Sequence, residues 1–93
     1  MERDIERYLV QQTKSLGGTC LKFVSPGCNG VPDRILLLPG AKLAFVEVKR
    51  PDGGRTSKLQ LYWIQVLREL GFNAVIVRNK AEIDDLLRRM TNE

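Results

Sequence analysis

The stretch "GVPDRILLLPGAKLAFVEVKR", residues 30–50, contains two apolar runs of the kind that form neighbouring strands in a buried sheet. Only Pro39-Gly40-Ala41 separates the runs, and so short a connection predicts an antiparallel hairpin. Extending the strand pairing outward from this turn in the simplest register places Asp33 opposite Glu47. The Cβ atoms of such cross-strand neighbours lie about 5 Å apart. Two carboxylates at that separation repel each other unless a proton or a cation lies between them.

The second strand of this hairpin should carry Glu47 and Lys49 on one face, because successive side chains of a strand alternate between its faces. Both faces are largely apolar, so a carboxylate buried there requires an opposite charge or a metal ion. Carboxylate and carbonyl oxygens are the ligands that Mg²⁺ and Mn²⁺ prefer. We therefore predict that Asp33, Glu47 and the Val48 carbonyl hold such an ion. The ion would activate water and neutralise phosphoryl charge, and Lys49 would orient the attacking water.

The same residues also allow a purely structural interpretation. Glu47 and Lys49 could form an ordinary ion pair at a frayed sheet edge, with Asp33 as a turn residue, and spacing alone leaves both interpretations open. The net charge of +4 and the pI near 9.4 give mild support to a site that meets a polyanion.

Outside the hairpin, the periodicity of apolar residues predicts the other elements of an α/β fold. A capping Ser57 and a terminating Gly71 bound the middle helix. Because a helix separates the last strand from the hairpin, we expect the last strand to pair in parallel with the second strand of the hairpin. The expected order is α-β-β-β-α-β-α, with one small mixed sheet flanked by helices. The helices are expected at 2–16, between the cap Ser57 and Gly71, and at 80–90, and the strands at 20–25, 34–39, 42–49 and 73–79. Residues 50–57 should form a turn-rich loop. The middle helix should bury an apolar arc of Leu59, Tyr62, Trp63, Val66, Leu67 and Leu70.

The composition of the chain excludes several classes of protein. Its 93 residues, without a repeat or linker, predict a single domain over residues 1–93. The sequence has no histidine and no G-x-x-x-x-G-K-[ST] loop, which argues against His-based hydrolases and metal sites and against the usual NTPases. Cys20 and Cys28 are expected to be free thiols. No apolar run suits a membrane span and the polar start excludes a secretory signal, so we expect a cytosolic protein, in a bacterium or a phage-infected host.

Several motifs resemble a known family of nucleases. "GVPD" at 30–33, followed by a hairpin and "EVK" at 47–49, resembles the PD-(D/E)xK nuclease superfamily. More closely, "IER", "KFVSPG", "GVPDRI", "FVEVKRPDGGRTSKLQ" and "GFNAVIV" resemble the virus-type replication-repair nuclease (VRR-NUC) domain over about residues 2–79. The resemblance implies a restriction-endonuclease-like core, Asp33 and Glu47 as metal ligands together with the Val48 carbonyl, and Lys49 as the catalytic lysine.

Two further positions follow from the resemblance alone. The acidic residue that the family carries in its first helix best matches Glu6, as a metal ligand, with Glu2 one turn earlier as the fallback. Alternating charges along that helix are equally typical of a solvated face. The family's glutamine after ExK matches Gln60, whose amide should face the sheet and brace the site or a phosphate. The alternative is an amide that caps a backbone group.

Together these features predict a Mg²⁺- or Mn²⁺-dependent endodeoxyribonuclease that acts in DNA repair or replication. By resemblance we expect a homodimeric Holliday junction resolvase. A flap or single-strand nicking nuclease, a non-catalytic nucleic-acid-binding module, and a subunit recruited by a helicase or replication partner remain alternatives. Any one basic residue near the site could be ordinary surface charge, but as a set they fit a groove that follows the DNA backbone. The set comprises Lys22, Arg34, Arg50, Arg55 and Lys58.

Overall fold

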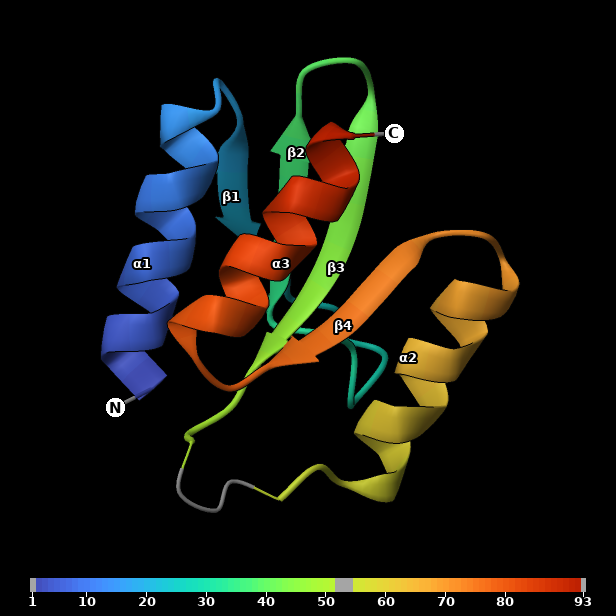
Figure 1. The fold of residues 1–93 in the computed structure, drawn as a ribbon. Coiled ribbons are helices and arrows are strands. Elements are labelled where there is room, and N and C mark those ends of the chain that lie inside the picture. Colours follow the sequence, from blue (N-terminus) through green and yellow to red (C-terminus); the bar gives the residue numbers. More distant parts are fainter. Residues whose placement is uncertain (1, 52–54, 93) are drawn as a thin grey trace.

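In the part of the chain that the structure describes, four strands form one mixed sheet in the order β1-β2-β3-β4, with three helices packed around it (Figure 1). The structure is a computed structural model that describes residues 2–51 and 55–92. The predicted α-β-β-β-α-β-α order is confirmed. The elements are α1 (Glu2–Ser15), β1 (Thr19–Lys22), β2 (Arg34–Leu38), β3 (Lys42–Val48), α2 (Lys58–Glu69), β4 (Asn73–Val77) and α3 (Lys80–Thr91).

The hairpin of β2 and β3 has the predicted register. Its pairs run from Arg34 opposite Val46 to Leu38 opposite Lys42. The turn between the strands takes two residues with positive φ, Gly40 at 85° and Ala41 at 60°. A turn of this kind folds the strands back with a fixed offset. As a result, Asp33, which directly precedes β2, lies level with Glu47 near the end of β3.

The two outer strands pair with the hairpin in opposite senses. β4 runs parallel to β3, as the intervening helix predicts. β1 runs antiparallel to β2, but it ends at Lys22, so the prediction of a strand up to Ser25 was too long. One further contact follows the last pair, from the Phe23 N–H to the Asp33 carbonyl at 2.7 Å. The chain then leaves the sheet, because the next residues lead into the Pro- and Gly-rich loop.

The main core lies between the sheet and the helices α1 and α3, which cover the same face (Figure 1). The apolar residues of both helices recur at helical spacing, so each helix presents one stripe to the strands. On β3, alternation directs Ala44, Val46 and Val48 into this core. Glu47 therefore lies on the opposite face. The core consists of Ile5, Leu9, Leu36, Leu38, Ala44, Val46, Val48, Val77, Ile83, Leu86, Leu87 and Met90.

The other face of the sheet is covered less completely. Phe45 contacts Phe23 and Phe72, with ring centroids 5.8 and 5.6 Å apart. Helix α2 packs against β4, the edge strand, and Ile64 is its buried residue. Because α2 meets the sheet at one edge strand rather than at its middle, several of its apolar side chains stay exposed. The expected apolar arc (Leu59, Tyr62, Trp63, Val66, Leu67, Leu70) was therefore wrong for Leu59, Tyr62 and Leu70, which are exposed.

Three smaller differences from the predictions concern the helices and the loop. Trp63, expected in the core, is only half-buried and stacks edge-on against Tyr62. Helix α1 ends at Ser15, which leaves Leu16 exposed. Of the predicted loop over 50–57, residues 52–54 lie outside the described ranges. None of the helices in the described ranges is long and apolar enough to cross a membrane.

Candidate active site

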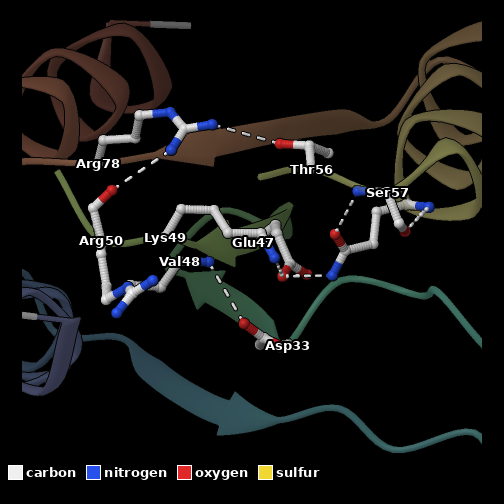
Figure 2. A network of polar contacts seen from close by, with 9 residues as sticks. Asp33, Glu47, Val48, Lys49, Arg50, Thr56, Ser57 and Arg78 are labelled. Atoms are coloured by element: carbon white, nitrogen blue, oxygen red, sulfur yellow. Dashed lines mark hydrogen bonds and ion pairs between the residues drawn. The ribbon is translucent and has the colours of Figure 1, made fainter. Parts of the chain in front are cut away.

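Asp33 and Glu47 lie close together at the open end of the β2–β3 hairpin, one position beyond its last pair, Arg34 and Val46 (Figure 2). The Glu47 side chain is only 3% exposed. Asp33 follows the buried Pro32 and is held from the other side by the Val48 N–H, which lies 3.4 Å from Asp33 Oδ2. The structure thus brings the two predicted carboxylates together, one just before β2 and the other near the end of β3.

The two oxygens of Glu47 have different surroundings. Oε2 lies 3.3 Å from Lys49 Nζ and accepts a hydrogen bond of 2.9 Å from Gln60 Nε2. Oε1 is buried and has no hydrogen-bond partner within the described part of the chain. A buried oxygen without a donor is costly. A proton, a water molecule or a cation at this position would satisfy it.

The pKa of Glu47 reflects this environment. Burial raises it most, the neighbouring Asp33 carboxylate raises it further, and Lys49 lowers it, with a resulting pKa of about 7. A carboxylate that repels its neighbour and is poorly solvated holds its proton longer. Without a cation, a fraction of the Glu47 side chains therefore stays protonated near neutral pH, which lowers the cost of burying the carboxyl group.

The donor set fits a divalent cation that retains water. Mg²⁺ commonly takes one or two carboxylates together with waters. The carbonyl of Val48 points to the same side of β3 as its N–H, toward Asp33, because both groups of one strand residue face the same neighbour. Across residues 2–51 and 55–92, no cluster of three or more Asp, Glu, Cys or His side chains has metal-binding geometry. A site here would consist of Asp33, Glu47, the Val48 carbonyl and waters.

Gln60 reaches the site from the first turn of α2. The predicted N-cap Ser57 is confirmed, and with Gln60 it forms a capping box. The Ser57 N–H donates to Gln60 Oε1 at 3.0 Å, while the amide nitrogen faces Glu47. The Gln60 amide therefore makes both kinds of contact that were open alternatives from the sequence. It caps a backbone group and braces the carboxylate.

Glu6 is not brought into the carboxylate pair. Its Oε2 forms an ion pair with Arg34 at 2.9 Å, and the two side chains are 31% and 12% exposed. Glu6 and Asp33 line the same hollow of about 260 Å³. Glu6 is thus held by the Arg34 guanidinium rather than by a contact with Asp33 or Glu47, and its role as a metal ligand stays a prediction. The side chain of Glu2, the fallback, lies outside what the structure describes.

The five predicted basic residues differ in accessibility. Lys22, Arg50, Arg55 and Lys58 are exposed, whereas Arg34 is mostly covered. Lys22 and Arg34 border the hollow that contains Asp33. A larger hollow of about 540 Å³ lies between α2, β4 and α3, and none of the predicted site residues lines it. The chemistry of the carboxylates, not the size of a cavity, therefore identifies the site.

Two residues around the site were not predicted to belong to it. Arg78, which follows β4, donates to the Arg50 carbonyl at 3.3 Å and to Thr56 Oγ1 at 3.4 Å, so it links both ends of the loop beyond Lys49 (Figure 2). Ser57 was predicted as a helix cap only. The S-x-x-Q spacing of a capping box could have linked Ser57 to Gln60. No comparable signal in the sequence connects Arg78 to the loop.

Comparisons with known proteins identify the family of this chain. The family profile of the VRR-NUC domain matches residues 3–81. "Putative nuclease p44" of Acyrthosiphon pisum secondary endosymbiont phage 1 is 42% identical over 86 residues, covering 92% of this chain and 90% of that protein.

Two solved structures are similar as well. One, named "VRR_NUC domain", has a TM-score of 0.87 and 29% identity over 94% of both chains. Another, named "VRR_NUC domain protein", shares the fold, with a TM-score of 0.74 and 14% identity over 98% of this chain and 88% of that one. By its sequence and its fold, this chain belongs to the VRR-NUC domain family of nucleases.

Proposed function

We propose that this chain is a Mg²⁺- or Mn²⁺-dependent endodeoxyribonuclease that cleaves branched DNA, with the four-way junction as its preferred substrate. The observation that carries the proposal is the pairing of Asp33 with a buried Glu47 that has one oxygen held and one without a donor. Such a pair is unfavourable alone and becomes favourable with a hard dication. Family membership supports the nuclease class, and the junction as substrate rests on the resemblance described above.

In this proposal, Asp33, Glu47 and the Val48 carbonyl hold the metal ion. When bound, the ion activates water and offsets charge on the phosphoryl oxygens. Gln60 keeps Glu47 in place through the hydrogen bond to Oε2. This bond leaves Oε1 available, so the ligand is oriented before substrate arrives.

Lys49 supplies the positive charge beside the carboxylates. Its Nζ lies 3.3 Å from Glu47 Oε2, and its side chain is 16% exposed, so the ammonium group is fixed yet reachable. We propose that it donates a hydrogen bond to the attacking water and offsets the charge that develops on the phosphate. The exposed Lys22, Arg50, Arg55 and Lys58 would contact neighbouring phosphates without reading the sequence.

A junction requires two cuts, and each chain offers one such site. We therefore propose that the protein acts as a homodimer with two-fold symmetry, which is the commonest arrangement of identical subunits. The two sites would face symmetry-related strands of the junction.

The decisive experiment incubates the purified protein with labelled junction, flap and linear duplex DNA of equal length, in Mg²⁺, Mn²⁺ or EDTA. We expect cleavage of the junction with either metal, none in EDTA, and none by Lys49→Ala or Asp33→Ala. Lys14→Ala is the matched control for lysine removal, because Lys14 is exposed at the end of α1. It should cleave like the wild type.

Three outcomes would contradict the proposal at different levels. Cleavage that survives EDTA, or that persists in Lys49→Ala, would remove the metal mechanism. A preference for flaps over junctions would leave the metal mechanism in place but show that the flap, not the junction, is the preferred substrate. Tight DNA binding without cleavage in either metal would identify a binding module.

A further inference from the structure

A chain of hydrogen bonds connects the start of α2 to the carboxylate pair (Figure 2). Ser57 Oγ accepts from the backbone N–H of Gln60 at 3.1 Å. The Ser57 N–H donates to Gln60 Oε1 at 3.0 Å, and Gln60 Nε2 donates to Glu47 Oε2 at 2.9 Å. The Gln60 side chain therefore connects the N-cap residue Ser57 directly to Glu47.

This arrangement fixes which way the Gln60 amide points. A side-chain amide has an acceptor oxygen at one corner and a donor nitrogen at the other. If the amide were reversed, its oxygen would face the Glu47 carboxylate and its NH₂ group would face the Ser57 N–H. Both contacts would be repulsive. The capping box thus selects the orientation in which Gln60 donates to Glu47.

The cap is one of the few contacts that hold the first turn of α2, besides the close approach of Leu59 to Gly30. Lys58 and Leu59 are exposed, and the buried residue of α2, Ile64, lies one turn further along. The first N–H groups of a helix have no partner within the helix, so an uncapped first turn frays. The Ser57 hydroxyl satisfies the Gln60 N–H and thereby holds that turn closed.

We propose that Ser57 is a positioning residue of the active site, which acts through Gln60 to hold Glu47 in the geometry that binds the metal ion. This inference rests on the proposed function, because it assigns Ser57 a role in the same site. Groups that orient metal ligands from outside the ligand set commonly affect metal affinity as well as activity. Ser57 itself touches neither the ion nor the DNA in this scheme.

The test compares Ser57→Ala and Ser57→Thr with the wild type. Calorimetry without DNA measures Mn²⁺ affinity, and kinetics on the labelled junction separate kcat from KM. We expect Ser57→Ala to weaken Mn²⁺ binding and to lower kcat by roughly two- to tenfold, with KM for DNA unchanged. Ser57→Thr, which still caps the helix, should restore both quantities.

Asn79→Ala is the matched control. Asn79 caps α3 by accepting a hydrogen bond from the Glu82 N–H, so its removal takes away a cap of the same kind from another helix. We expect a similar loss of stability with unchanged Mn²⁺ affinity. Ser57→Gly covers the case in which Ser57→Ala fails to fold, because glycine is tolerated at an N-cap but has no hydroxyl. It should weaken Mn²⁺ binding in the same direction as Ser57→Ala does, by a smaller factor.

The inference and the proposed function can fail separately. If the wild type binds Mn²⁺ but Ser57→Ala or Ser57→Gly binds it as tightly as Asn79→Ala does, Ser57 has no positioning role. Failure of Ser57→Thr to restore affinity would also overturn the inference. If the wild type binds no Mn²⁺ and cuts no DNA, the proposed function itself is wrong.

Discussion

Glu47 is a buried carboxylate, and the free energy of its charged form depends on the hydrogen bonds and charges of its neighbours. Lys49 and Gln60 satisfy Oε2, while Asp33 and the surrounding apolar atoms make the charged form unfavourable. This balance explains how one short hairpin can hold two acids without unfolding. It also makes the charge state of Glu47 a measurable property of the metal-free protein.

The first prediction concerns Asp33→Ala. The substitution removes a carboxylate that repels Glu47 and loses one long hydrogen bond to the Val48 N–H. In EDTA at pH 8 we expect a melting temperature equal to or above that of the wild type, and retained DNA binding through the basic residues. Cleavage should fall by at least about 100-fold, because even groups outside a ligand set often contribute 10- to 100-fold. A melting temperature well below the wild type would contradict the account of repulsion.

The second prediction is a pH dependence that comes from Glu47. Its pKa is about 7 in the folded protein, against an ordinary value of 4.5. The folded state therefore holds a proton that the unfolded state releases as the pH rises from 4.5 to 7. The contribution to stability is complete below pH 4.5 and is lost as the pH rises through 7. In EDTA, urea unfolding should show a decrease on the order of 1–3 kcal/mol over this window.

Glu47→Gln provides the control for this pH dependence. Glutamine has nearly the same shape and does not titrate, so its unfolding free energy should change less between pH 5 and pH 8 than that of the wild type. Its NH₂ group could also donate to Asp33. An equal pH dependence in both proteins would show that another group titrates.

The pairing of Asp33 with Glu47 could be predicted from sequence because it depends on local geometry. A three-residue turn sets the register, and the register sets which side chains are opposite. The pairing of Glu6 with Arg34 could not be predicted in this way. It depends on how far α1 is displaced along the sheet, which is decided by core packing between residues distant in sequence.

At the scale of elements, the loop before β2 is held against α2 by a close contact at Gly30. Its φ is +88°, and an added Cβ would lie 2.6 Å from Leu59 Cγ. Both the backbone conformation and the contact therefore require glycine. The loop that carries Asp33 and the helix that carries Gln60 approach each other closely at this point.

The third prediction follows from this contact. Gly30→Ala should lower the free energy of unfolding by about 1–3 kcal/mol and displace the first turn of α2, so that Mn²⁺ affinity also falls. Gly27→Ala is the matched control, since no atom lies within 4 Å of an added Cβ there. Urea unfolding and calorimetry measure both effects. The prediction fails if the two variants are equally stable.

The elements themselves were predictable to the extent that their ends carry local signals. Ser57 and Gly71 mark α2, and the helix before β4 implies a parallel strand. The burial of α2 was predicted less well. Apolar periodicity shows which face of a helix is apolar but not how much of another surface it meets, and α2 packs mainly against the edge strand β4 and the loop at Gly30.

For the whole molecule, binding of a metal ion should be coupled to stability. The fourth prediction is that Mn²⁺ at pH 8 raises the melting temperature, because the folded state binds the ion and the unfolded state does not. At a concentration 100 times Kd the gain is about 2.7 kcal/mol, which corresponds to a shift on the order of 10 °C for a chain of this size. Glu47→Gln should show almost no shift, and NaCl of equal ionic strength is the control. Equal shifts in both proteins would mean that the ion binds elsewhere.

The fifth prediction concerns assembly. Helix α2 has several exposed apolar side chains, including Leu61 at 50% and Tyr62 at 57% exposure. A helix that is apolar on several faces is usually covered by something. The proposed two-site mechanism requires a second copy of this chain, so we expect α2 to pair with its symmetry mate, and light scattering should give twice the subunit mass of 10.6 kDa.

Tyr62→Glu tests this assembly, because a charge at a two-fold interface faces its own copy and the two repel. We expect the variant to be monomeric and to cut junctions one strand at a time, while its Mn²⁺ affinity stays unchanged. Gln11→Glu adds the same charge to an exposed position of α1 and should remain dimeric. A monomeric wild type would refute the homodimer, whereas a dimeric Tyr62→Glu would place the interface on another surface. Paired cleavage by a monomer would show that one site can act on both strands in turn.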